Sequence, residues 1–371
     1  SPKRAWRSGS RVDLLEVAMM LYGLLALSAT AAALSRAAPR MGGHAVIVQN
    51  KGGGHGEIGF HLAAALRAKD VGVTILQDAA AKKTKLPYSK YDDLDNVNVV
   101  WCADVTDAAA VEAALAGVEV THIFDNYAKS PADAAAYVAL AKKTDAFYAF
   151  VSSAGMYTTN GILKETHAVK VTGQREVELS LEAELPGKWC AFRPQYIYGP
   201  YTNKREYLDW FLNRVVRDIP MAVPGDAQQP VSITHCADVA ALMSCVVGNE
   251  AKAAGEVFNV GTSRMCSYDD VCLAAAAAFG KPSPIVASLT VGTKSSFPFR
   301  PNAEGFAVRT RKAQDVLGWA GAKHDVLEDL KTWYKDDFLA LKLDEGDLDT
   351  SLDKLEECAN LKQDFAKSVP K

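Results

Sequence analysis

The stretch HAVIVQNKGGGHGEIGF, residues 44–60, decides the fold. An apolar run, 44–49, leads into a loop in which Gly53, Gly56 and Gly59 are spaced by three, and helical spacing begins directly afterwards. A strand, a glycine turn and a helix N-terminus together present backbone N–H groups and a positive dipole end, which suits a pyrophosphate. The stretch therefore predicts the opening unit of a dinucleotide-binding fold.

The chain then alternates apolar runs with helical segments. The runs are 71–78, 97–102, 119–125 and 146–153, and the helical segments between them include 106–117 and 131–143. Strands that alternate with helices of ten to fifteen residues predict an α/β fold with a doubly wound parallel sheet of the Rossmann type. Beyond Ser153 the pattern loosens, which indicates a smaller, mixed C-terminal domain. Its expected elements are a helix at 205–219, a strand at 255–262 and a capped helix at 267–280.

These patterns divide the chain into four parts. We expect a Rossmann-type domain at 42–185, with its sheet completed by part of 186–262, and a smaller domain at 186–340. Residues 1–41 contain 21 mostly apolar residues, 14–34, behind four basic ones, which predicts a targeting presequence or a retained membrane anchor. Seven acids and one lysine lie within 344–357, so 341–371 is expected to be an acidic tail.

Composition restricts the classes of function. With 371 residues, 49% of them hydrophobic and 23% charged, the chain is that of a soluble globular protein. The net charge of −3 becomes −7 without residues 1–40, so an RNA site must be a local patch and not a generally basic surface. The seven cysteines form no CxxC pair, which favours buried thiols in a reducing compartment.

Acidic residues after two strands suit a bound nucleotide. Asp78 ends the second strand about 25 residues after Gly53, where a carboxylate can accept ribose hydroxyls. Asp104 and Val105 follow the third strand and are expected near the adenine. NAD(P) is therefore a candidate cofactor, and lysines in the loop after Asp78 favour an extra ribose phosphate. The alternative is a glycine turn that serves only close packing of helix and sheet, and Glu57 would repel a pyrophosphate if it pointed inward.

The spacing of further motifs resembles the extended short-chain dehydrogenase/reductase superfamily over most of 44–335. The motifs are GxxGxxG at 53–59, VSSAGMY at 151–157, FRPQYIYGP at 192–200 and THCADVA at 234–240. The resemblance implies a catalytic Ser, Tyr and Lys, the last two as Tyr-x-x-x-Lys. Ser153 occupies the serine position, but the segment 164–180, where the pair should lie, contains no tyrosine. Dehydrogenase chemistry therefore lacks its acid–base group.

Longer stretches resemble the chloroplast stem-loop-binding proteins, atypical members of that superfamily. They are GGHGEIGFHLA (53–63), FRPQYIYGPYTNKREYLDWFLNRVVRDIPMAVPG (192–225), QQPVSITHCADVA (228–240) and FPFRPNAEGFAVRTRKAQDVLGW (297–319). The resemblance implies a plastid location, in the stroma or at the thylakoid, and binding of structured RNA. It also implies divalent-metal-assisted endoribonuclease activity in some members, with Mg²⁺ as the candidate ion, and oligomeric assemblies that include ribosomes or a membrane complex. NAD(P) is then an optional ligand.

Basic and aromatic residues cluster where RNA contacts are expected. The candidates are Lys204, Arg205, Arg214, Arg217, Arg309 and Arg311. The alternative is that these are surface charges beside core aromatic residues. Weak catalytic candidates are Ser153, His235 and Asp238, and no metal ligand set is identified. Two other functions stay open: an NAD(P)-dependent sugar-nucleotide epimerase or reductase, and a non-catalytic structural subunit of a plastid complex.

Overall fold

The computed structural model describes residues 43–49, 55–202, 204–218, 220–282, 284, 286–289 and 296–344. The expected presequence or anchor at 1–41 lies outside these ranges, as do Gly53 and the acidic tail beyond residue 344. Among the helices described, none combines the length and apolarity needed to cross a bilayer.

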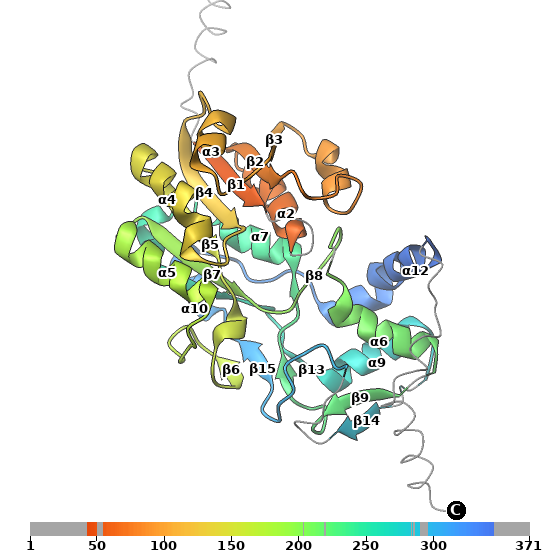
Figure 1. Ribbon diagram of the computed structural model, residues 1–371. Helices are drawn as coiled ribbons and strands as arrows, with labels where there is room; N and C mark the ends of the chain where they lie inside the picture. Colours follow the sequence, from red (N-terminus) through yellow and green to blue (C-terminus); the bar gives the residue numbers. More distant parts are fainter. Residues whose placement is uncertain are drawn as a thin grey trace, which may run out of the picture. The chain divides into compact units, whose positions relative to one another are not determined.

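A seven-stranded parallel sheet forms the larger part of the structure (Figure 1). Its strands lie in the order β12-β7-β5-β4-β1-β2-β3. Successive strands are therefore added on one side of β1 up to β3 and on the other side from β4 onwards. The strands are β1 His44–Gln49, β2 Gly72–Asp78, β3 Val97–Cys102, β4 Val120–Asn126, β5 Phe147–Val151, β7 Trp189–Pro194 and β12 Glu256–Val260. Two of them, β7 and β12, come from the sequence after residue 185.

Helices cover both faces of this sheet, and the central strands are buried on both sides. In β1, Ala45 and Ile47 enter one core and Val46 and Val48 the other. The first core includes α2 Gly56–Arg67, α7 Cys236–Ser244, α8 Glu250–Ala253 and α10 Arg311–Leu317. The second includes α3 Ala108–Ala114, α4 Pro131–Thr144 and α5 Gly173–Glu184. The predicted doubly wound α/β fold is confirmed.

A smaller region with mixed sheets adjoins the carboxyl ends of these strands (Figure 1). Its four-stranded sheet contains β13 Cys266–Ser267, β10 Pro230–Val231, β15 Phe306–Val308 and β6 Gly161–Leu163. Two short pairs join β8 Ile197–Tyr198 to β11 Thr234–His235, and β9 Met221–Pro224 to β14 Val286–Leu289. Its helices are α6 Glu206–Val216, α9 Tyr268–Ala278, α11 Val326–Asp329, a π-helical turn η3 Leu330–Tyr334, and α12 Lys335–Asp344. Short 3₁₀ turns lie at η1 Tyr88–Asp93 and η2 Ala154–Met156.

Capping residues set the starts of two helices. Ser130 and Asp133 form a capping box at α4, with Pro131 as the first helical residue. Ser267 and Asp270 form the same box at α9. Each box satisfies backbone N–H groups that a helix start leaves without partners. These starts agree with the helical segments expected from the sequence at 131–143 and 267–280.

Candidate functional site

A cavity of about 450 Å³ lies at the carboxyl ends of the central strands. Loops after β4, β5 and β7 form its walls, together with the start of α2, the start of α5 and the segment that leads into α6. Ligands of open α/β sheets bind at this edge, where the winding reverses. We refer to this cavity as the cleft.

The cleft is cationic. Lys129, Lys204 and Arg300 line it, and its described lining includes no aspartate or glutamate. Lys129 is exposed, and the Nζ of Lys204 lies 3.9 Å from the nearest carboxylate oxygen of Glu206. This charge favours an anionic ligand, even though the chain as a whole is acidic.

Arg300 is held in a fixed position by the protein. Its guanidinium donates to the backbone carbonyls of Gly155 (2.8 Å) and Tyr157 (3.1 Å), and it lies 3.9 Å from the ring centre of Phe306. Arg300 therefore joins the loop after β5 to the C-terminal segment, and its charge stays at the wall of the cleft.

The glycine loop is described only from His55 onwards. The amide of Gln49 donates to the carbonyl of Gly56, and its oxygen accepts from Asn126, which also donates to the carbonyl of His55. A Cβ at Gly59 would come within 2.2 Å of the Gln49 amide nitrogen. Gly59 therefore permits the close approach of α2 to β1, the packing role that the sequence left open.

Glu57 does not line the cleft. Its side chain is fully buried, and one carboxylate oxygen lies 2.9 Å from Nδ1 of His55. Burial is the main cause that raises the pKa of Cys236 at the start of α7, and the charge of Glu57 adds to it, which places the Glu57 carboxylate on the side of α2 that faces α7. The carboxylate of Glu57 thus approaches the cleft lining through its pair with His55.

The acids expected at the ribose lie together at the edge of the sheet. Asp78 ends β2 and accepts from the N–H of Ala80 at 2.8 Å, while Asp104 accepts from the N–H of Thr106 at 2.8 Å. After burial, the carboxylates of Asp78 and Asp104 are among the causes that raise the pKa of Tyr127, so the three are neighbours. The side chain of Val105 is fully buried in the core at this edge.

The serine of the expected catalytic set lines the cleft without its partners. Ser153 is half-buried, and its Oγ accepts from the N–H of Gly155 at 3.1 Å. From the helix that should supply the Tyr-x-x-x-Lys pair, α5, only Gln174 lines the cleft. Tyr157 is 1% exposed, and its hydroxyl donates to Asn259 and accepts from Arg193. It lies outside the cleft lining.

Three other tyrosines line the cleft, and none has a lowered pKa. Burial is the main cause that raises the pKa values of Tyr127 and Tyr207, and it raises that of Tyr196 to about 12. Proton exchange at neutral pH needs a phenol whose pKa lies closer to 7. The tyrosines of the described cleft lining therefore offer a phenol surface, and none of them is poised for proton exchange at neutral pH.

His235 and Asp238 fix a loop. Nδ1 of His235 accepts from the N–H of Ala237 and caps α7, while Asp238 accepts from the N–H groups of Lys323 and His324 at 3.0 and 3.1 Å. His235 is 3% exposed, and neither residue lines the cleft. The structure places these two catalytic candidates in the joint between α7 and the segment before α11.

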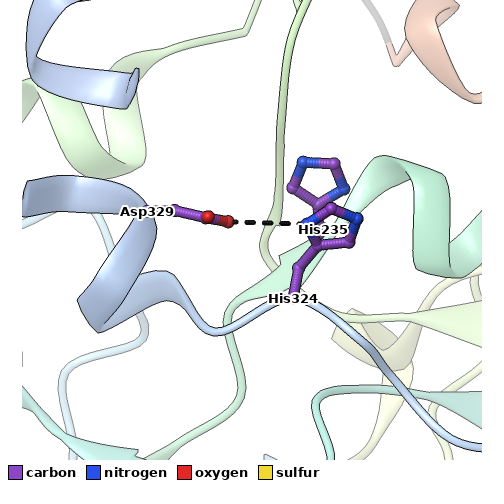
Figure 2. Close-up of side chains that lie close together, drawn as sticks. All are labelled: His235, His324 and Asp329. Atoms are coloured by element: carbon purple, nitrogen blue, oxygen red, sulfur yellow. Dashed lines mark ion pairs between the residues drawn. The ribbon is translucent and has the colours of Figure 1, made fainter. Parts of the chain in front are cut away.

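His235, His324 and Asp329 bring their side-chain ligand atoms within 4.8 Å of one another (Figure 2). The two imidazoles are stacked, however, with ring centres 3.6 Å apart and planes at 12°. Parallel stacked rings direct their nitrogen lone pairs along parallel lines, so both cannot reach one ion at about 2.1 Å. Mg²⁺ also prefers oxygen ligands. This cluster does not fit the expected divalent ion.

Two of the residues expected to bind RNA are enclosed by the smaller region. Arg205 pairs with Asp209 (3.2 Å) and Asp337 (2.5 Å) and lies over the ring of Tyr334. Arg214 is 4% exposed and lies 3.7 Å from the ring centre of Trp210. Their guanidinium groups are therefore engaged inside the protein.

The other expected RNA contacts are more open. Lys204 lines the cleft. Arg217 is half-buried and donates to Asn213. Arg309 and Arg311 are both exposed, and Arg311 pairs with Asp315. The sequence interpretation did not include Tyr127 and Lys129. Their position directly after the strand β4 is the signal that identifies them, because ligands bind at the carboxyl ends of strands.

Comparisons with known proteins agree with this architecture. Residues 52–261 match the model of the NAD dependent epimerase/dehydratase family. The chain is 34% identical over 201 residues to the chloroplast stem-loop binding protein of 41 kDa b of Arabidopsis thaliana, and the match covers 52% of each chain. The matched stretch is thus about half of that relative's length.

Solved structures share the fold at low identity. The dTDP-glucose 4,6-dehydratase of Bacillus anthracis, in complex with NAD, superposes with a TM-score of 0.62 at 16% identity, covering 80% of this chain and 97% of its own. UDP-glucose 4-epimerase of Thermotoga maritima, with UDP-glucose, has a TM-score of 0.60 at 17% identity, covering 81% and 99%. The family match, the sheet order and the cleft at the strand ends agree: the chain belongs to the NAD dependent epimerase/dehydratase family.

Proposed function

We propose that this protein binds structured RNA in plastids and that the cationic cleft holds the RNA. The observation that carries the proposal is the lining of the cleft, which combines Lys129, Lys204 and Arg300 with no carboxylate among its described residues. Phosphate contacts from lysine and arginine supply most of the affinity for nucleic acids. Similarity to a chloroplast stem-loop binding protein supports RNA as the anion and the plastid as the location.

The scaffold supports a nucleotide more readily than it supports redox turnover. Asp78 and Asp104 lie at the strand edge where a ribose and adenine are expected, and structures of this fold have been solved with NAD. The segment 164–180 nevertheless offers no tyrosine, and the phenols in the cleft have raised pKa values. In our proposal NAD(P) is an optional ligand that RNA binding does not require.

The second candidate is a sugar-nucleotide epimerase or reductase. It is favoured by the family match and by a similar fold solved with UDP-glucose. It needs a replacement for the missing acid–base pair. Ser153 is the one member of the expected catalytic set that lines the described cleft, and its hydroxyl is bound to a backbone N–H. An assay for conversion of a sugar nucleotide therefore separates the two candidates.

The test is a titration of the full chain against a fluorescent stem-loop RNA at several salt concentrations. Parallel titrations use NAD(H) and NADP(H). Absorbance reports net reduction of NAD(P) with UDP-glucose, and chromatography of the sugar nucleotide reports epimerisation, in which the hydride returns to the sugar. We expect RNA affinity tighter than the roughly 1–100 μM of non-specific contacts, and lower affinity at higher salt. RNA binding should persist in EDTA, because no carboxylate lines the described cleft to hold Mg²⁺. A cleavage readout with and without Mg²⁺ tests the endoribonuclease expectation on the same RNA.

Two results would overturn the proposal. One is RNA affinity no tighter than the non-specific range at low salt. The other is catalytic conversion of a sugar nucleotide, by epimerisation or by net hydride transfer, which would favour the epimerase or reductase candidate. Variants of Lys129 and Lys204 then locate the contact, with Lys142→Ala as the matched control, because Lys142 is exposed on α4 and outside the cleft lining.

A further inference from the structure

Aromatic rings form one wall of the cleft. Tyr207 stacks on Phe299, with ring centres 5.4 Å apart and planes at 19°. Tyr196 meets Tyr207 edge to face at 5.2 Å and Phe299 at 4.6 Å. One side of the half-buried Tyr207 ring packs against Phe299, and the rest of the ring faces the cleft. This wall is rigid, because each ring is held by at least one other.

An unused hydrogen-bond acceptor lies in the same cleft. Gln195 is 2% exposed and lines the cleft. Its amide nitrogen donates to the carbonyl of Phe306, which fixes the amide orientation, and its Oε1 has no partner among the described residues. A buried acceptor without a partner is costly, so such atoms point to a missing donor. Gln174 offers a second amide in the lining, from the start of α5.

The size of the cleft limits what can enter. Its volume of about 450 Å³ falls in the range of pockets for small molecules, roughly 300–1,000 Å³. A base-paired helix is too wide for such a cavity, whereas one unpaired nucleotide is of suitable size. Its phosphate group is an anion, and the exposed amine of Lys129 and that of Lys204 come from two different loops of the lining.

We propose that the cleft takes one unpaired nucleotide from the loop of the RNA. The base stacks on Tyr207 and donates an N–H to Oε1 of Gln195, while Lys129 and Lys204 contact the flanking phosphates. Each of the four bases carries an N–H group on its Watson–Crick edge, so this arrangement selects for an unpaired base and not for one sequence. The inference rests on the proposed RNA-binding function and adds to it that the protein recognises single-stranded loops.

The experiment uses the full chain and a stem-loop RNA with 2-aminopurine at one loop position. A second RNA carries 2-aminopurine in the stem, and a third is fully paired. Anisotropy of an end label reports binding, and 2-aminopurine fluorescence reports stacking. The variants are Tyr207→Ala, which removes the ring, Tyr207→Phe, which keeps it, and Trp101→Ala, a half-buried aromatic residue outside the cleft.

As protein is added, we expect the fluorescence of the loop probe to change over the same concentration range as the anisotropy. The fluorescence of the stem probe should stay constant. Tyr207→Ala should lose the loop signal and bind the stem-loop roughly 5- to 150-fold more weakly, the range for loss of one stacked base. Tyr207→Phe should restore the signal, Trp101→Ala should behave as wild type, and the paired RNA should bind more weakly than the stem-loop.

The failures of the two proposals can be told apart. If stem-loop RNA binds tightly and with salt dependence, but Tyr207→Ala keeps both the affinity and the loop signal, the nucleotide inference is overturned and the RNA-binding proposal stands. If Tyr207→Ala unfolds, equal affinity of the wild type for paired and stem-loop RNA overturns the inference. If no RNA binds, both proposals fail.

Discussion

Arg193 and Glu178 form a buried ion pair beneath the floor of the cleft, with Nε and NH2 of the arginine 2.9 and 2.6 Å from the two carboxylate oxygens. Ser152 and Arg175 also donate to this carboxylate, and NH1 of Arg193 donates to the hydroxyl of Tyr157. Burial alone would raise the pKa of Glu178, but the hydrogen bonds and charge of Arg193, with Ser152 and Arg175, hold it below its usual value. The network joins α5, β5 and β7.

Glu178→Ala should be strongly destabilising. It leaves Arg193 buried without its partner, which costs about 3–5 kcal/mol in unfolding free energy. Glu184→Ala is the matched control on the same helix, because its exposed pair with Lys142 is worth at most about 1 kcal/mol. Urea denaturation followed by circular dichroism measures both. Equal losses in the two variants would show that the buried pair contributes no more than a surface pair.

His235 should make the fold sensitive to acid. Burial, with the charges of His324 and His61, lowers the pKa of His235 to about 3. The unfolded chain, with a histidine pKa near 6.5, therefore binds the proton first, and stability falls as pH drops from about 6.5 towards 3. The slope for this one group is about 1.4 kcal/mol per pH unit.

His235→Asn isolates that effect. Asparagine is a good N-cap and can replace Nδ1 as the acceptor for the N–H of Ala237, but it does not titrate. Thermal unfolding from pH 7 to pH 4.5 should show a flatter dependence in the variant. Part of the slope will remain, since His44 and His61 also have lowered pKa values. An unchanged slope would contradict the assignment to His235.

Tyr157→Phe should affect stability and not RNA binding. The hydroxyl donates to Asn259 at 2.7 Å, inside the protein and outside the cleft lining. Its removal leaves a buried amide oxygen without its donor, at a cost of about 1–3 kcal/mol. Chemical denaturation and RNA anisotropy measure the two effects. Loss of a hydride-transfer activity in this variant would instead show that Tyr157 acts as a catalytic phenol.

Arg214 and Arg311 should respond differently to substitution by alanine. Arg214 stacks on Trp210 and is buried, so Arg214→Ala should lower the unfolding free energy by about 2 kcal/mol or more. Arg311 is exposed and pairs only with Asp315 among the described residues, so its substitution should cost less than about 1 kcal/mol. A stable Arg214→Ala variant with reduced RNA affinity would show that Arg214 contacts RNA directly.

Much of the fold could be predicted from the sequence. The alternation of apolar runs and helices from 44 to 153 predicts the parallel sheet, because buried strands and amphipathic helices have different periods. The motif at 151–157 places Ser153 at the end of β5, and the structure brings it into the cleft. The sequence also shows that 164–180 contains no tyrosine. In the structure, the helix α5 contributes Gln174 to the cleft lining and no phenol.

The composition of the cleft could not be predicted in this way. The sequence predicts that Arg214 contacts RNA, because it lies in a stretch rich in basic and aromatic residues, but the helix turns its side chain into the smaller region, against the ring of Trp210. Lys129 and Arg300 line one cavity although 171 positions separate them. Contacts of this kind depend on how loops from different strands meet, and local periodicity carries no information about that.

The most direct test of the central claim is the salt dependence of RNA binding by Lys129→Ala/Lys204→Ala. Each lost phosphate contact should reduce the slope of log K against log salt by roughly 0.7–0.9. Measured by anisotropy from low to moderate KCl, the double variant should show a slope lower by about 1.4–1.8, again from these per-contact values. Lys142→Ala should keep the wild-type slope. An unchanged slope and affinity in the double variant would contradict the claim that the cleft holds the RNA.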